Sequence, residues 1–285
     1  LHVQAASAEV DAIKAGGAAD LQATAGLTLR AADVAGRLVL RADQLKLAGL
    51  QVGGDLDGEA KGALSVSGAA SRIGGKLTLQ ANEAQIASLT SHGDASLSVT
   101  GALVADQFGG DAAVKVSARS AQLTGLKAGG DASIVVAEAA AVTGQVGGAL
   151  ELQAQRIDVG SLSVGGKSQL LAQADLKLDG FVGKQAAVLQ GLDVQLVKAS
   201  FDESLALKAS TLTVGGVQAG AATLSVTGAV KGDGLSAGKL ALQSDSLQLK
   251  QLAVAGDADL QVKAGLAIET ARVAGSLTAS AADQD

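Results

Sequence analysis

The chain is built on a repeat in which two glycines are followed by a strict alternation of polar and apolar residues. The clearest copy, residues 74–81, reads Gly-Gly-Lys-Leu-Thr-Leu-Gln-Ala. When the second glycine is taken as the anchor of each copy, successive anchors lie about 18 residues apart, a period typical of a solenoid. The fifteen anchors are at 17, 36, 54, 75, 93, 110, 130, 148, 166, 183, 203, 220, 238, 256 and 275, and only Glu203 is not glycine.

The columns of this alignment predict a strand after each anchor. Four places after the anchor, twelve of the fifteen residues are Leu, Val or Ile, and two places later stands a column of mostly Ala and Val. Since side chains alternate between the faces of a strand, Leu152 should be buried and Gln153 solvated. All three phenylalanines, Phe108, Phe181 and Phe201, fall two residues before an anchor. Phe181 and Phe201 therefore share a column in neighbouring coils, and their rings should lie within about 4.5–7 Å.

An apolar spacing of two, interrupted by glycine in every coil, excludes helical repeats, which need a period of 3.6. We predict an all-β fold, a right-handed parallel β-helix solenoid of about 15 coils with roughly 18 residues per coil. Residues 1–16 are an imperfect lead-in, residues 180–203 are the least regular part, and the pattern fades over residues 281–285. Gly58 stands in the Leu column and should leave the place of a leucine empty.

Composition limits the function classes. A net charge of −6 argues against nucleic acid as a partner, because its recognition needs a basic surface. No apolar run approaches the length of a membrane span. The chain starts at Leu1 without a signal peptide, so we expect residues 1–285 to be a single β-helix repeat segment and a fragment of a longer chain. A β-helix cut in this way exposes a strand edge at each end, which predicts end-to-end self-association.

Few residues carry chemistry. The two histidines, His2 and His92, lie in the lead-in and just before an anchor, where we expect no catalytic or ligand role. Asp94, Asp111 and Asp131 follow anchors in successive coils, and such a column of carboxylates could hold Ca²⁺. The same column elsewhere carries Arg and Lys, which favours a solvated face of mixed charge, and the sequence leaves the cation question open. We predict no enzyme, and no catalytic, cofactor-binding or metal-binding residue.

The run Gly-Gly-Asp-Leu-x-x-x-Ala at residues 53–60, with its relatives at 74, 109, 129, 147 and 165, resembles the repeats of filamentous-haemagglutinin-type exoproteins. The resemblance covers nearly the whole chain. It implies a structural shaft segment of a large secreted bacterial surface adhesin, which extends a binding domain from the cell. It further implies export through an outer-membrane two-partner-secretion transporter, a secreted or cell-surface location, and contact with a host-cell surface or glycan through other parts of the parent chain.

An alternative function is a binding module in which a face of the β-helix itself recognises a glycan or receptor. Ice-binding faces present regular columns of Thr, and the outward column that begins Asp20, Val39, Asp57 and Thr78 has no such regularity. A glycan-binding face favours aromatic platforms, and the chain has no Trp or Tyr. The shaft is therefore the preferred hypothesis.

Overall fold

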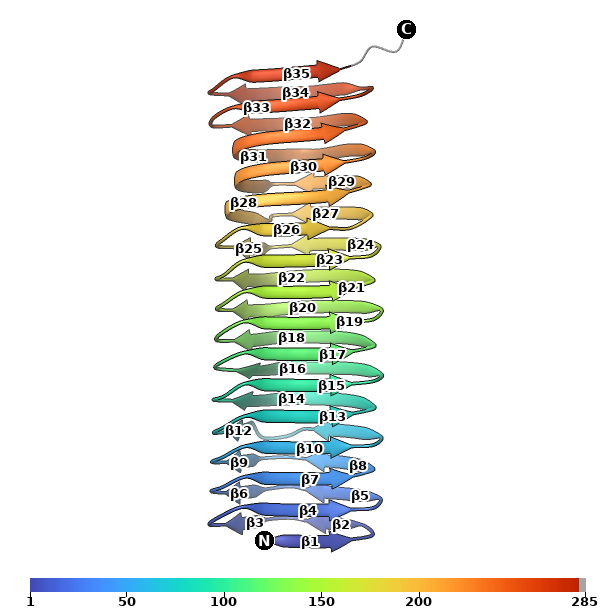
Figure 1. Ribbon diagram of the computed structural model, residues 1–285, viewed down its shortest axis with the longest axis vertical. Coiled ribbons are helices and arrows are strands. Elements are labelled where there is room, and N and C mark those ends of the chain that lie inside the picture. Colours follow the sequence, from blue (N-terminus) through green and yellow to red (C-terminus); the bar gives the residue numbers. More distant parts are fainter. Residues whose placement is uncertain (282–285) are drawn as a thin grey trace. The chain divides into compact units, whose positions relative to one another are not determined.

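The computed structural model describes residues 1–281, which contain only strands and no helix. The strands form a β-solenoid of about 16 coils, stacked about 18 residues apart. The chain divides into two compact units, unit 1 (Leu1–Gly148) and unit 2 (Ala149–Asp285). Within each unit the near strands of Figure 1 run to the right and the more distant strands return to the left as the chain rises, so the coil is right-handed. The hypothesis of a single repeat segment over residues 1–285 stays a prediction.

Each coil has three faces, which we call A, B and C in chain order, and face A begins two places after the anchor. The face A strands of unit 1 are β1 His2–Ala5, β4 Ala19–Ala23, β7 Leu38–Ala42, β10 Leu56–Ala60, β13 Leu77–Ala81, β15 Ala95–Val99, β17 Val114–Ala118 and β19 Ala132–Val136. Faces B and C have separate strands in the first four coils and one merged strand afterwards. These strands are β2 Ala8–Val10, β3 Ile13–Ala15, β5 Gly26–Leu29, β6 Ala32–Val34, β8 Gln44–Leu47, β9 Leu50–Val52, β11 Ala63–Val66, β12 Ser71–Ile73, β14 Glu83–Ser91, β16 Ala102–Gly110, β18 Ser120–Ala128 and β20 Ala139–Val146.

Unit 2 repeats this plan with longer strands, some of which run through a corner from one face to the next. The strands that include face A are β21 Leu150–Ala154, β23 Ser168–Ala172, β26 Ala187–Gln190, β28 Ser200–Ala209, β30 Val217–Val226, β31 Ala229–Ser244, β33 Ala258–Val262 and β35 Leu277–Ala281. The remaining strands are β22 Arg156–Val164, β24 Asp175–Asp179, β25 Phe181–Gly183, β27 Asp193–Val197, β29 Thr211–Gly215, β32 Ser246–Val254 and β34 Leu266–Val273.

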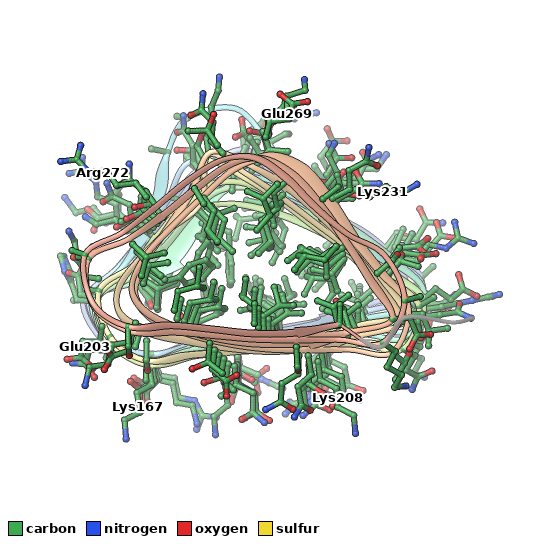
Figure 2. The ribbon with its side chains drawn as sticks, turned by 90° about the horizontal axis from the view of Figure 1, so that it is seen from above. Lys167, Glu203, Lys208, Lys231, Glu269 and Arg272 are labelled. Atoms are coloured by element: carbon green, nitrogen blue, oxygen red, sulfur yellow. The ribbon has the colours of Figure 1, made fainter. Side chains whose placement is uncertain are left out.

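Every face pairs in parallel with the same face of the neighbouring coil inside its unit. On face A of unit 1, for example, Leu40 has Leu21 as its partner on one side and Gly58 on the other. The inward columns form the core: Leu152 is fully buried, whereas Gln153 on the other side of the strand is half-buried. Figure 2 shows apolar side chains filling a three-sided ribbon, with Lys167 and Lys208 of unit 2 pointing outward. The predicted alternation of buried and solvated columns is confirmed.

The anchor glycines mark a corner where the backbones of successive coils approach closely. The N–H of Gly54 donates to the carbonyl of Gly36 at 3.1 Å, and the N–H of Gly93 donates to the carbonyl of Gly75 at 3.1 Å. A Cβ at Gly54 would lie 2.9 Å from the carbonyl carbon of Gly36, and one at Gly93 would lie 2.9 Å from that of Gly75. Because these contacts are with backbone, a side chain at either position would push the coils apart. The close stacking of the backbone at this corner therefore explains the Gly-Gly pair of the repeat.

Two of the fifteen predicted anchors are wrong. Leu97 pairs with Val116 rather than Val114, and Leu170 pairs with Leu189 rather than Ala187. The anchor positions of these coils are residues 112 and 185 instead of Gly110 and Gly183, which makes the spacings more even (93, 112, 130 and 166, 185, 203). A shift of two keeps every side chain on its original face, so the apolar pattern alone cannot detect it.

The phenylalanines change column with these anchors. Phe108 and Phe181 lie four places before the corrected anchors, while only Phe201 lies two places before one. Phe201 is the strand partner of Gly183, so Phe181 and Phe201 do not share a column as predicted. The two rings nevertheless lie 5.6 Å apart and tilted by 37°, within the predicted range. Gly183 makes this contact possible, because a Cβ there would lie 3.1 Å from the Phe181 ring.

Two further expectations are corrected at the N-terminal side of unit 1. The place beside Gly58 is not empty, because a Cβ at Gly58 would lie 2.6 Å from Cδ2 of Leu79 in the next coil. Residues 1–16 are a coil in their own right, since Val3 pairs with Leu21 and Ile13 with Ala32. This coil brings the total to about 16. Of the predicted loss of pattern over residues 281–285, residues 282–285 lie outside the described part of the chain.

A second corner, between faces B and C, uses the left-handed backbone conformation. Glycine occupies this corner with positive φ at Gly49, Gly68, Gly125, Gly180 and Gly216. Ser88, Gln107 and Lys198 take the same conformation, with φ of 53°, 53° and 49°. A residue with a Cβ pays about 1–2 kcal/mol there, because the Cβ crowds the following carbonyl oxygen. The three side chains are therefore points of local strain in an otherwise regular stack.

Replacing Lys198 by glycine should raise the free energy of unfolding by about 1 kcal/mol, since glycine adopts positive φ without crowding. Chemical denaturation followed by circular dichroism measures the change. The matched control is Lys208→Gly in β28, a surface lysine on an ordinary strand, where glycine should cost about 0.5–1 kcal/mol. Equal destabilisation by both substitutions would show that residue 198 is not in the left-handed conformation.

Candidate functional site

The aspartates that follow anchor glycines bind the backbone of the next coil. The Oδ1 atom of Asp55 accepts the N–H of Lys76 at 2.8 Å, and Oδ1 of Asp94 accepts the N–H of Ala113 at 3.1 Å. Asp257 does the same for the N–H of Ser276 at 2.9 Å and also accepts its hydroxyl at 2.8 Å. Here the strands of face A have not yet begun, so the carboxylate supplies an acceptor just before the sheet ladder starts. These carboxylates tie neighbouring coils together at the glycine corner.

The predicted cation column of Asp94, Asp111 and Asp131 is not a single column. Asp94 and Asp131 follow the anchors at 93 and 130, but the position between them belongs to Ala113. Asp111 lies before its anchor, where its Oδ2 is 2.7 Å from Nδ1 of His92. Within residues 1–281, no three His, Cys, Asp or Glu side chains are grouped closely enough to hold a metal ion. The slip of two residues at anchor 110 explains the misplaced carboxylate.

Both histidines are exposed and each faces a carboxylate of the neighbouring coil. Nδ1 of His2 lies 3.5 Å from Oδ2 of Asp20, and His92 faces Asp111 as described above. Both histidine–aspartate pairs are surface contacts between neighbouring coils.

The ion pairs on the surface join side chains of neighbouring coils. Arg119 contacts Glu138 at 2.8 Å, and in unit 2 Lys263 contacts Asp245 at 2.9 Å. Exposed pairs of this kind contribute about 0.2–1 kcal/mol each and are weakened by salt. They favour the interpretation of the outward columns as a solvated face of mixed charge.

Two adjoining hollows lie on the surface of unit 1. The larger, about 410 Å³, runs along the corner between faces A and B over the first four coils, and alanines 5, 23 and 42 lie at its base. The smaller, about 210 Å³, lies on face A around Gly58. Arg41 and Glu59 line both hollows, and their side chains lie 3.6 Å apart. Sequence reasoning missed this place, because its residues belong to different coils and none is unusual in type.

The pKa of Asp257 lies below its ordinary value because the carboxylate accepts the backbone N–H and then the hydroxyl of Ser276. A group whose pKa falls on folding adds stability above its unfolded pKa, and that stability is lost as the pH falls through the folded value. Protonation of Asp257 at acid pH therefore weakens the contact between its coil and the coil of Ser276.

Comparison with known proteins gives no relative: no family model, no curated protein and no solved structure matches the chain. In residues 1–281, no helix is long and apolar enough to cross a membrane.

Asp257→Asn should reduce the loss of stability between pH 5 and pH 2, because the variant has no charge to neutralise at this position. Denaturant midpoints measured across that range test the change. Asp259→Asn is the control, since that carboxylate accepts the side-chain amide of Gln261 rather than a backbone N–H. If the acid dependence of Asp257→Asn equals that of the unaltered chain, the hydrogen bonds of Asp257 do not stabilise the stack.

Proposed function

We propose that the chain is a structural shaft segment of a large secreted bacterial surface adhesin, which extends a binding domain from the cell. The observation that carries the proposal is the regular stacking of coils inside each unit, with all three faces paired from one coil to the next. Each added coil lengthens such a stack by one strand spacing, about 4.8 Å, without changing its cross-section. The length of such a stack therefore increases by the same amount with each added coil.

The distribution of side chains supports a spacer rather than an enzyme. The outward columns carry mixed charge, and the acidic residues already identified contact backbone N–H groups or basic side chains of a neighbouring coil. Carboxylates engaged in this way hold neighbouring coils together. We propose no catalytic activity and no cofactor.

Export and location are proposed from the resemblance of the repeats alone. An outer-membrane two-partner-secretion transporter would pass the chain to the cell surface or the medium. The parent protein would then contact a host-cell surface or glycan through other parts. The absence of proline and cysteine in the chain is compatible with this route, since folding after export requires neither prolyl isomerisation nor disulfide formation.

A variant that lacks residues 18–93 tests the spacer function, because the deletion joins one anchor glycine to Asp94 and removes four whole coils. We expect the maximum dimension to shorten by roughly 19 Å, four strand spacings, at an unchanged cross-sectional radius. Small-angle X-ray scattering of both chains measures the two quantities. A variant that remains folded with the same maximum dimension, or with a changed cross-section, would contradict a shaft built coil by coil.

A further inference from the structure

We propose that face A of unit 2 binds the same face of a second copy of the chain, with the coils of the two copies parallel. The proposal goes beyond the shaft function, since a spacer needs no lateral partner. The surface, which we call the lateral strip, consists of the outward residues on face A of β23, β26, β28, β30 and β31. These residues are Gln169, Leu171, Val188, Gln190, Ala206, Lys208, Thr223, Ser225, Ala241 and Gln243.

Charge is nearly absent from the lateral strip. Only one of its ten residues, Lys208, is charged, and Figure 2 shows it on a straight side of the ribbon. On face A of unit 1, by contrast, four of the six outward residues of β4, β7 and β10 are charged, namely Asp20, Arg41, Asp57 and Glu59. Depletion of charge at the centre distinguishes a protein interface from the rest of a surface.

Exposed apolar side chains are grouped on the strip and at its border. Val188 is 46% exposed, and Leu171 of the neighbouring coil is half-buried. Leu192, at the corner between faces A and B in the coil of Val188, is 54% exposed. Gln190 connects the three, since it is the strand partner of Leu171 and lies two residues from Val188 and from Leu192. Removal of these side chains from water favours a partner that covers the strip.

The strip has one column of mostly short side chains and one of mostly long side chains. The first column is Gln169, Val188, Ala206, Thr223 and Ala241, and the second is Leu171, Gln190, Lys208, Ser225 and Gln243. Facing sheets pack by interdigitation of their side chains, which requires short residues opposite long ones.

A second copy supplies that complement. Rotation by 180° about an axis parallel to the stack places the first column of each copy opposite the second column of the other. Lys208 then lies opposite Ala206 of the partner copy, so like charges do not face each other. Rotation about an axis along the strands would instead set long columns against long columns. The arrangement of side chains therefore favours a parallel pair.

The area of the strip indicates a weak, reversible pair. Five strands about 4.8 Å apart, each about 17 Å long, cover about 400 Å² on each copy. A stable interface buries about 800 Å² on each partner. We therefore expect a dissociation constant between about 10 µM and 500 µM.

Sedimentation velocity over about 10 µM to 1 mM, a range that spans this dissociation constant, tests the pairing. The sedimentation coefficient should rise from that of a monomer towards that of a dimer. Val188→Glu should raise the dissociation constant about tenfold or more, because each carboxylate would lose water without a partner. The matched control is Val104→Glu on β16, which has the same charge change at a valine that is 45% exposed and lies outside the strip.

Three results of this experiment would overturn the proposal. The first is a monomer at every concentration, and the second is an equal effect of both substitutions. The third is association that Val188→Glu leaves unchanged, which would assign the contact to the strand edges at the ends of the chain. Both valines are exposed, so both variants should keep the thermal unfolding midpoint of the unaltered chain.

Crosslinking tests the parallel orientation, since the chain has no cysteine of its own. Gln169→Cys and Ala241→Cys lie on the first and last strands of the strip, four strand spacings or about 19 Å apart. When the two variants are mixed and treated with a short bismaleimide, a parallel pair should join like with like. Intact mass distinguishes the products. Mostly mixed products, or no product at concentrations where the dimer sediments, would contradict the parallel pair.

Discussion

The backbone hydrogen bonds between successive coils are the interaction on which the rest of the structure depends. They hold each coil about one strand spacing from the next on three faces, and every residue choice must respect that distance. At the anchor corner, Gly54 and Gly93 stand where a side chain would meet the backbone of the coil before, whereas Ala112, Gln185 and Glu203 hold the same position in other coils. Proline, which would remove a donor from the ladder, is absent from the chain. The narrow interior is filled mainly by Leu, Val and Ala, and the rings of Phe108, Phe181 and Phe201 are fully buried in it.

Much of this architecture could be predicted from the sequence, because the two periods in it have direct physical causes. The period of two places Leu152 inside and Gln153 on the outer side, and the period of about 18 defines the coil. What the sequence could not decide was register in steps of two, since Val114 and Val116 both face inward and both suit the core. The second corner was also missed. Its signal is a further column of glycines, at Gly49, Gly68 and Gly125, which serves backbone conformation rather than close approach.

The candidate site was less predictable because it depends on neighbours that are distant in sequence. Asp94 and Asp111 look equivalent beside their glycines, yet one accepts a backbone N–H and the other faces His92. The hollows around Arg41 and Glu59 arise from a strip of small residues at a corner and from one glycine inside a strand. Neither feature is a motif, and each hollow forms only when coils are stacked in the correct register.

Disulfide trapping tests the coil register most directly, because the chain has no cysteine of its own. Ser98 and Ser117 are strand partners whose hydroxyls lie 3.2 Å apart, while Lys115 is on the same face but two residues away along the strand. Strand partners stand about 4.8 Å apart, inside the range of a disulfide, whereas an offset of two residues gives about 8 Å, outside it. Mild oxidation should therefore close an intramolecular disulfide in Ser98→Cys/Ser117→Cys and not in Ser98→Cys/Lys115→Cys. Efficient closure of the second pair with failure of the first would contradict the stacking described for these coils.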